Sequence, residues 1–323
     1  AKTLPPGTGT QADVPSNLLI LLDASGSMGW RMSSAQSVNY PMQSTTDSSG
    51  NIFVSQYYIY GVKKFTYANK KIDTNWGESG VHKGRSSSSQ CRVYYNYGSA
   101  KIHNGIIYVP SYYDRKIRMI RESDGACLGS ITINQYITGF DIHTISGTAH
   151  LFALHRGGVY TRNLSNNVSK TCSHGNNNYL RYTFAAAANS ETAGNYLYTY
   201  YANRIARFEL VASGNNFCPQ PSGYKTTSRS MGSVYGMTAH PTNAGELYFM
   251  SYSNSKLYKV TVAANGTSHT LNWTKGSRRY NGTSSSSALY FYYPLGVHYD
   301  DTNNRIITSG YNSRTVEILD DNG

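Results

Sequence analysis

The chain has 323 residues, of which 14% are charged and 30 are tyrosine, and its formal charge is +12, from 29 Lys and Arg against 17 Asp and Glu. The length allows one large domain or two ordinary ones. Low charge with abundant Tyr, Ser, Asn, Thr and Gly is typical of many short strands joined by polar turns. The longest aliphatic run, Leu18 to Leu22, is too short to cross a bilayer, which excludes a membrane span. The positive charge favours an acidic partner such as an anionic glycan, a cell surface or nucleic acid, although a basic solvated surface is the simpler explanation.

The first expected element is a strand over Asn17–Leu22, which leads into the loop "DASGS". The Asp23 carboxylate and the hydroxyls of Ser25 and Ser27 are hard oxygen ligands of the kind that Mg²⁺ or Ca²⁺ takes. The strand and loop together resemble the opening of a von Willebrand factor A domain, as in type IV pilus tip adhesins of the PilY kind. The resemblance implies a Mg²⁺ or Ca²⁺ site that is open to an acidic group of a partner. Such a domain needs a Thr and an Asp from later loops, and here those ligands would have to come from outside the chain.

From Ser48 onward one pattern recurs six times: a turn with Gly or Asn, an alternating apolar strand, a short polar turn and a second strand. Two runs of period 2 separated by a turn predict a β-hairpin. Successive copies lie about 40–60 residues apart, the spacing of four-stranded propeller blades and too long for a solenoid coil. The copies are Ser48–Phe65, His103–Ile120, Gly147–Leu164, Ala193–Leu210, Ala244–Thr261 and Thr302–Leu319.

Further strand-like segments flank several hairpins. We expect "QYITGFDIH", "SVYGMTAHP" and "YPLGVHYDD" to be innermost strands, with Gly where the blades crowd around the axis, and "GACLGSITI" and "HTLNWTKG" to be outer strands. The opening "DSSGNIFV" (Asp47–Val54), followed by "VKKF", resembles the NHL-repeat family, which implies an all-β, six-bladed β-propeller. We therefore expect an N-terminal extension over 1–39 and a propeller of six four-stranded blades over 40–323. A divergent seventh blade around Thr74–Tyr94 remains open.

The sixth copy ends in a third strand, so its outer strand is missing. An unpaired strand edge invites aggregation, and closed propellers pair it with a strand from the other terminus. Asn17–Leu22 is the only unassigned strand-like run near the N-terminus. We expect Asn17–Leu22 to complete blade six beside Thr315–Leu319, as an alternative to the metal-loop interpretation.

The chain has four cysteines, and none of them is in a CxxC pair. This spacing argues against a zinc ribbon and against c-type haem attachment. An even count in a polar, Tyr-rich chain indicates two disulfides and an oxidising compartment. Three connectivities are possible, and we favour the one that links neighbouring repeats. The expected pairs are Cys91–Cys127 and Cys172–Cys218, in a secreted protein of the extracellular space or cell surface.

Three histidines, His143, His240 and His298, lie in or beside the expected innermost strands. The resemblance to NHL-type lyases implies that histidines of separate blades converge on one metal, and three imidazoles can hold Zn²⁺. The alternative is that each histidine is a polar residue beside the axial channel.

Tyrosine pairs recur near the expected blade turns, at Tyr57-Tyr58, Tyr112-Tyr113, Tyr200-Tyr201 and Tyr292-Tyr293. Exposed aromatic rings stack on sugars or partner proteins. Successive residues of a strand point to opposite faces, so half of these rings are equally expected to pack between blades.

The function predicted from these features is binding: a surface adhesin or pilus-associated propeller with a protein or glycan surface ligand. One alternative is a structural subunit of an extracellular filament, whose partners are copies of itself. A further alternative is an NHL-type metal-dependent lyase or hydrolase, although no Ser-His-Asp spacing, phosphate loop or nucleophile elbow is present and we expect no enzyme. The basic residues lack any nucleic-acid-binding signature, which disfavours nucleic acid.

Overall fold

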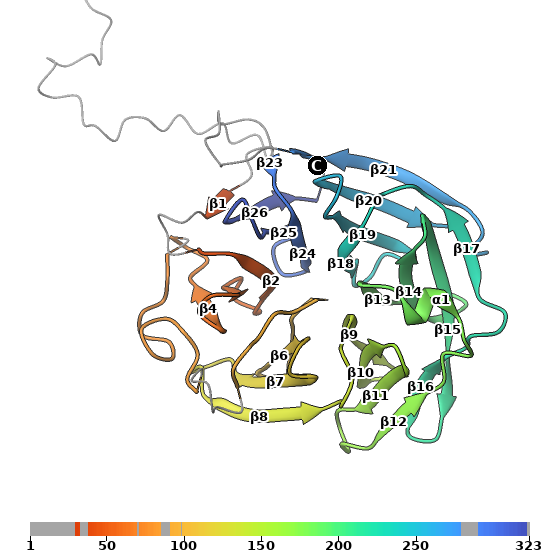
Figure 1. Ribbon diagram of the computed structural model, residues 1–323, viewed down its shortest axis with the longest axis horizontal. Helices are drawn as coiled ribbons and strands as arrows, with labels where there is room; N and C mark the ends of the chain where they lie inside the picture. The colour runs from red at the N-terminus through yellow and green to blue at the C-terminus, as the bar shows by residue number, and fades with distance from the viewer. Residues whose placement is uncertain are drawn as a thin grey trace, which may run out of the picture.

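The computed structural model describes residues 30–32, 38–69, 71–84, 91–97, 99–278 and 290–321. Six antiparallel sheets are arranged as blades around a central axis (Figure 1), so the six-bladed β-propeller is confirmed. In the described residues helix is limited to one turn, α1 (Asn178–Arg181), and none of them forms a helix long and apolar enough to span a membrane.

The blades follow one another in chain order, and each runs from an inner to an outer strand. Blade 1 contains β2 (Pro41–Thr46), β3 (Ile52–Gln56) and β4 (Gly61–Phe65). Blade 2 contains β5 (Lys101–His103), β6 (Ile106–Ser111), β7 (Lys116–Arg121) and β8 (Cys127–Thr132). Blade 3 contains β9 (Gly139–Ile145), β10 (Thr148–His155), β11 (Gly158–Asn163) and β12 (Ser169–Cys172).

The second half of the ring repeats this arrangement. Blade 4 contains β13 (Ala186–Glu191), β14 (Gly194–Tyr201), β15 (Arg204–Ser213), β16 (Asn216–Pro219) and, also on β15, β17 (Lys225–Ser228). Blade 5 contains β18 (Val234–Ala239), β19 (Glu246–Ser251), β20 (Lys256–Val262) and β21 (His269–Lys275). Blade 6 contains β24 (Pro294–Asp300), β25 (Arg305–Gly310), β26 (Thr315–Asp320) and β1 (Trp30–Met32), and β22 (Ser277–Arg278) pairs with β23 (Tyr290–Phe291) before it.

The six sequence copies form the two middle strands of the six blades, and the segments expected to be innermost or outer strands take those places. The core lies between blades, because each sheet buries the alternate residues that face its neighbour. Tyr198 of blade 4 and Phe249 of blade 5, for example, share one cluster and are both 0% exposed. The alternating apolar residues of each blade thus form a buried layer against the neighbouring blade.

Glycines on the inner strands allow the blades to crowd around the axis, as expected. A Cβ at Gly236 would lie 2.6 Å from the Leu295 carbonyl oxygen, and one at Gly296 would lie 2.6 Å from that of Met42. A real Cβ could not be so close to backbone atoms, so blades 5, 6 and 1 meet here only because glycine has no side chain.

The ring is closed by an N-terminal strand, but by a different one from the strand expected. β1 pairs antiparallel with β26, with Trp30 opposite Ile318 and Met32 opposite Val316. Asn17–Leu22 lies outside the described residues. The expectation rested on the most apolar run near the N-terminus, whereas the edge of β26 needs only a short segment with free backbone groups.

Blade 1 departs from four strands. The segment after β4 forms only isolated bridges, Ile72 with Phe65 and Val81 with Lys63, in place of an outer strand. Trp76 of this segment is buried, and its indole N–H donates to the Glu122 carbonyl of blade 2 at 2.7 Å. The described part of Thr74–Tyr94 therefore covers the edge of blade 1 and does not form a seventh blade.

Both disulfides have the expected pairing. Cys91, in the connection from blade 1 to blade 2, bonds Cys127 of β8. Cys172 of β12 bonds Cys218 of β16 and joins the outer edges of blades 3 and 4. Two disulfides are consistent with a secreted protein.

Candidate functional site

Aromatic side chains gather at one end of the propeller. In each blade the start of the inner strand and the turn between the second and third strands lie at the same end, as the pairing of Pro41 with Gln56 shows in blade 1. Sixteen aromatic residues of these segments form one connected network, which we call the tyrosine end. They are Tyr40, Tyr57, Tyr58, Tyr60, Tyr94, Tyr95, Tyr97, Tyr112, Tyr113, Tyr136, Phe184, Tyr235, Tyr252, Tyr292, Tyr293 and Tyr311.

None of these sixteen rings is buried, unlike the tyrosines of the core. Tyr58 is 59% exposed and Tyr113 is 52% exposed, whereas Tyr198 and Tyr248 in mid-strand are 0% exposed. Most neighbouring rings meet edge to face, the arrangement that the quadrupole of an aromatic ring favours. The network therefore forms a semi-rigid aromatic surface that remains open to solvent.

Aromatic and polar groups of the segment before β5 contact blades on the other side of the ring. Tyr97 of the segment before β5 contacts Phe184 and Tyr235, which enter blades 4 and 5, each at 5.3 Å between ring centroids. Two residues later the buried Ser99 hydroxyl lies 3.0 Å from the Met237 carbonyl oxygen of blade 5 and 3.1 Å from that of Val297 of blade 6. The start of blade 2 thus reaches across the centre of the ring.

Three hydroxyls of the tyrosine end, those of Tyr97, Tyr235 and Tyr311, stay protonated at neutral pH. Burial raises the pKa of Tyr97, Tyr235 and Tyr311 above the ordinary value, and the phenol of Tyr95 close by raises each further. A neutral phenol both donates and accepts hydrogen bonds. The end thus combines apolar ring faces with polar edges.

Four arginines stack on the rings of this end. The guanidinium carbon of Arg92 lies 4.1 Å from the Tyr60 ring centroid, that of Arg115 lies 4.5 Å from Tyr136, and that of Arg314 lies 4.4 Å from Tyr40. Arg278 stacks likewise on Tyr293 at 5.2 Å. These are cation–π distances. Within the described ranges, none of the four forms a salt bridge.

The opposite end of the propeller carries most of the acidic residues, and we call it the acidic end. It comprises the turns between first and second strands and between third and fourth strands. Its acidic residues are Asp47, Glu122, Asp124, Glu191, Glu246, Asp300, Asp301, Asp320 and Asp321.

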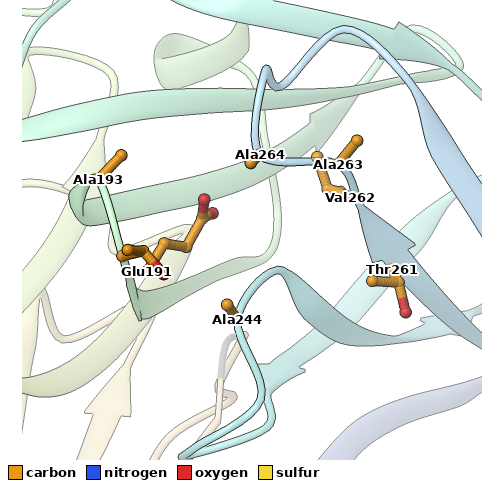
Figure 2. Close-up of a pocket in the computed structure, with 8 residues that line it drawn as sticks. Glu191, Ala193, Ala244, Thr261, Val262, Ala263 and Ala264 are labelled. Carbon is orange, nitrogen blue, oxygen red and sulfur yellow. The ribbon is translucent and has the colours of Figure 1, made fainter.

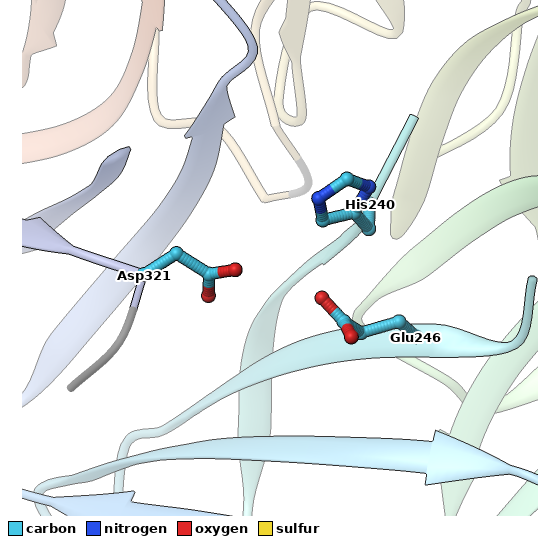
Figure 3. Close-up of side chains that lie close together, drawn as sticks. All are labelled: His240, Glu246 and Asp321. Carbon is cyan, nitrogen blue, oxygen red and sulfur yellow. The ribbon is translucent and has the colours of Figure 1, made fainter. Parts of the chain in front are cut away.

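One cluster at the acidic end has the spacing of a metal site. His240, Glu246 and Asp321 are buried and point toward one another (Figure 3), with one ligand atom of each within 4.8 Å of the others. The Lys259 ammonium, however, lies 3.0 Å from Glu246 and 2.9 Å from Asp321. Because this ammonium already pairs with both carboxylates, the cluster is best described as a buried ion-pair network.

His143 and His298 do not join His240. His298 is buried on β24 and accepts the Thr46 backbone N–H at Nε2, at 3.2 Å, while His143 Nε2 on β9 lies 3.0 Å from Ser190 Oγ. Burial, aided by the Lys101 ammonium, lowers the pKa of His298 to about 3. In the part of the chain described, the three histidines expected to hold zinc are not brought within ligand distance of a common ion.

Lys101 occupies the axial region beside these histidines. Its ammonium pairs with the buried Asp141 of blade 3 at 2.8 Å and lies 3.5 Å from Thr238 Oγ1 of blade 5. Burial lowers the pKa of His143, the Asp141 carboxylate opposes that effect, and the Lys101 charge adds to it. The axial polar groups are therefore largely neutralised among themselves.

A cleft with a volume of about 360 Å³ opens between blades 4 and 5 at the acidic end (Figure 2). Ala193, Ala244, Ala263 and Ala264 line it. Its only ionisable group, Glu191, is already paired with Arg207 at 2.8 Å. With a mostly apolar lining and no free charge, the cleft lacks the convergent polar groups that fix a ligand.

The metal-loop residues Asp23, Ser25 and Ser27 lie outside the described residues. Three of the four tyrosine pairs noted in the sequence belong to the tyrosine end. The fourth does not, because Tyr200 is buried in the core and Tyr201 packs on Tyr179 and Tyr182.

Sequence reasoning missed the tyrosines that precede the inner strands, such as Tyr94, Tyr95 and Tyr97, and the stacked arginines. Their position within each repeat could have predicted them. These residues lie on the same side of each repeat as the hairpin turns, and a blade brings those two segments to one end of the ring.

No family model matches the chain, and no curated protein matches it. Among solved structures, virginiamycin B lyase from Staphylococcus aureus is similar with a TM-score of 0.53 at 11% identity, over 90% of this chain and 98% of the other. An auxiliary nutrient binding protein from Bacteroides thetaiotaomicron has a TM-score of 0.55 at 12% identity, over 86% and 68%. Kuenenia stuttgartiensis hydrazine synthase has a TM-score of 0.54 at 10% identity, over 88% and 96%. At such identities the likeness shows the propeller fold alone.

Proposed function

We propose that this protein is an extracellular binding protein of the adhesin type, which holds its ligand on the tyrosine end. The observation that carries the proposal is the network of sixteen rings, none of them buried. A contiguous apolar patch of this kind marks an interaction site in most soluble proteins. Tyrosine also provides large contact area with little loss of side-chain entropy.

Packing between blades accounts for only part of this network, since Tyr57, Tyr95, Tyr235, Tyr252 and Tyr311 pack against a core cluster. Inter-blade packing uses tyrosines such as Tyr198 and Tyr248, which are fully buried in mid-strand. Most rings of the tyrosine end belong to turns or to segments before inner strands, and Tyr58 and Tyr113 leave more than half of their surface in water. Their exposure costs solvation free energy that a ligand would recover.

The test is a Tyr58→Ala/Tyr113→Ala double variant, assayed on immobilised glycans and on fixed cells by flow cytometry. Loss of two exposed rings at the centre of a contact is expected to weaken binding about tenfold or more, since such residues cost about 1–2 kcal/mol each when truncated. Tyr224→Ala is the matched control, because Tyr224 is also exposed but contacts Tyr179 and Phe208 outside the network.

Binding by the double variant that equals wild type would overturn the proposal. So would a wild-type protein that binds neither surface but self-associates, with light scattering showing monomers only in the double variant. That second result would favour the filament-subunit alternative.

A divalent cation at Asp23, Ser25 and Ser27 is a separate part of this proposal, supported by the sequence resemblance. If Mg²⁺ or Ca²⁺ at that loop contributes to adhesion, EDTA should weaken binding and added Mg²⁺ should restore it. Asp23→Ala should then bind as weakly as wild type in EDTA. If EDTA has no effect, the loop has no part in adhesion.

A further inference from the structure

We infer that the ligand of the tyrosine end is an acidic polysaccharide, whose sugar units carry carboxylate or sulfate groups. The inference rests on the proposed function and names the class of ligand. Two features carry it: a continuous path of neighbouring tyrosine rings, and arginines without acidic partners among the described residues at its beginning, middle and end.

Seven rings form a continuous path across the tyrosine end. Consecutive ring centroids along it lie between 4.6 and 6.1 Å apart. We call this path the tyrosine track. In order, it contains Tyr40, Tyr58, Tyr57, Tyr94, Tyr113, Tyr112 and Tyr136.

The spacing and exposure of the track suit a chain of rings. The ring-to-ring distance is comparable to the length of one pyranose unit, and the apolar C–H face of a pyranose can lie on a tyrosine ring. Among the tyrosines whose exposure the structure describes, the three with the largest exposed fractions, Tyr58, Tyr113 and Tyr136, all lie on the track. A compact ligand would need one pocket, whereas an extended polymer uses repeated contacts of this kind.

Arginines mark the two ends and the middle of the track. Arg314 stacks on Tyr40, the first ring, and Arg115 on Tyr136, the last. Arg92 stacks between Tyr60 and the central Tyr94, whose ring centroid lies 5.2 Å from its guanidinium carbon. Stacking holds each guanidinium plane in place while its edge can still donate paired hydrogen bonds to an anion.

These cations differ from those of the acidic end. There, Lys259, Arg207 and Arg305 all have carboxylates within 4 Å. At the tyrosine end, the Asp114 carboxylate is bound to Arg118 at 2.5 Å. Arg92, Arg115 and Arg314 have no acidic partner among the described residues, so the tyrosine end carries an uncompensated positive charge that attracts anions.

Rings alone would accept any sugar, and positive charge alone would accept any polyanion. Only a polymer that presents both apolar sugar faces and periodic negative charges satisfies the track and its arginines together. Single-stranded nucleic acid also combines stacking with charge, but two disulfides indicate an oxidising compartment. We therefore assign the site to polysaccharide and make nucleic acid an outcome of the test.

The experiment compares polygalacturonate with its fully methyl-esterified form by biolayer interferometry, using the full chain. The two polymers share one backbone and differ only at the carboxyl group, where a methyl ester replaces the carboxylate and removes its charge. We expect wild type to bind the acid at least about tenfold more tightly, because charge-assisted hydrogen bonds contribute about 1.5–3 kcal/mol each. Dextran sulfate against dextran is the second arm, which shows whether sulfate replaces carboxylate.

An Arg115→Gln/Arg314→Gln variant should bind the acid at least about tenfold more weakly and bind the ester as wild type does. The control, Lys170→Gln/Lys225→Gln, removes the same charge from exposed lysines outside the tyrosine end and should leave both affinities unchanged. Rising NaCl should reduce the preference for the acid, since salt screens exposed charges. Circular dichroism would show that both variants remain folded.

Equal binding of acid and ester by wild type, with loss in Tyr58→Ala/Tyr113→Ala, would overturn the acidic ligand and leave the binding function standing. Binding of neither pair of polymers would overturn this inference, while cell binding lost in the tyrosine variant would still support the proposed function. Tighter binding of oligo(dT) than of any polysaccharide would assign the track to nucleic acid and overturn the inference as well.

Discussion

A tyrosine in this protein takes its role from its place along the strand. In mid-strand, alternation directs one side chain in two toward the neighbouring blade, and Tyr198 and Tyr248 are completely buried there. In a turn the alternation ends, and Tyr57 and Tyr58 both reach the surface. The sequence therefore shows that aromatic residues gather near turns, but not that the turns of separate blades bring them into one network.

His298 should make stability depend on pH. Its pKa falls from 6.5 to about 3 on folding, because burial disfavours the charged imidazole and the Lys101 ammonium adds to that effect. Between these values the unfolded chain binds a proton that the folded chain excludes, so stability is complete above about pH 6.5 and falls as pH decreases. The loss is about 1.4 kcal/mol per pH unit.

The measurement is urea unfolding of wild type and His298→Gln at pH 7 and pH 5. Wild type should lose about 2 kcal/mol more than the variant between these values, because only wild type has the imidazole to protonate. Other histidines titrate equally in both proteins and cancel in the comparison. Equal losses would show that His298 is not held neutral by the fold.

At the level of elements, hairpins were predictable and the closing strand was not. Each hairpin is a local pattern with its turn inside one repeat, so Ser48–Phe65 identifies β3 and β4 without tertiary information. Closure depends on which remote segment meets the edge of β26, and that choice rests on backbone hydrogen bonds that nearly any residue can supply. The hydropathy pattern of the sequence therefore does not predict a three-residue strand such as Trp30–Met32.

Deletion of residues 1–32 should destabilise the propeller, since it removes β1 and leaves the outer edge of β26 unpaired. Deletion of residues 1–29 is the matched control and retains Trp30–Met32. We expect the longer deletion to lower Tm by about 4 °C or more, for a loss of about 2 kcal/mol, and to promote aggregation in light scattering. If both deletions have the same Tm, β1 contributes nothing to closure.

Over the described part of the molecule, the two ends differ in salt bridges: charged side chains of the acidic end pair with one another, whereas the stacked arginines of the tyrosine end do not pair with carboxylates. Several carboxylates of the acidic end pair with lysines and arginines, as around Lys259. Among the described residues, Arg115 and Arg314 at the tyrosine end form no salt bridge and instead stack on tyrosine rings and donate to their hydroxyls. Composition predicts the net charge but cannot show this separation, because basic residues that are adjacent in space are far apart in the chain.

The Cys172–Cys218 disulfide should contribute to the integrity of the ring because it joins two blades at their outer edges. A Cys172→Ala/Cys218→Ala variant is expected to unfold with about 2–4 kcal/mol less stability, as typical disulfides contribute. Cys91→Ala/Cys127→Ala is the comparison. The disulfide that it removes closes a loop of similar length, 36 against 46 residues, but does not link the outer edges of two blades. Chemical denaturation measures both; an unchanged midpoint for the first variant would contradict the expectation.

The position of the tyrosine track on one end of the propeller, where its most exposed rings lie at the surface, determines how a polymer can be held. A polymer bound on this surface does not pass through the ring, so it can bind without entering by one of its ends. Internal stretches of a long polymer are therefore as suitable as its termini. Affinity should therefore rise with the number of sugar units until the seven rings are covered, and beyond that length further units should add only a statistical advantage.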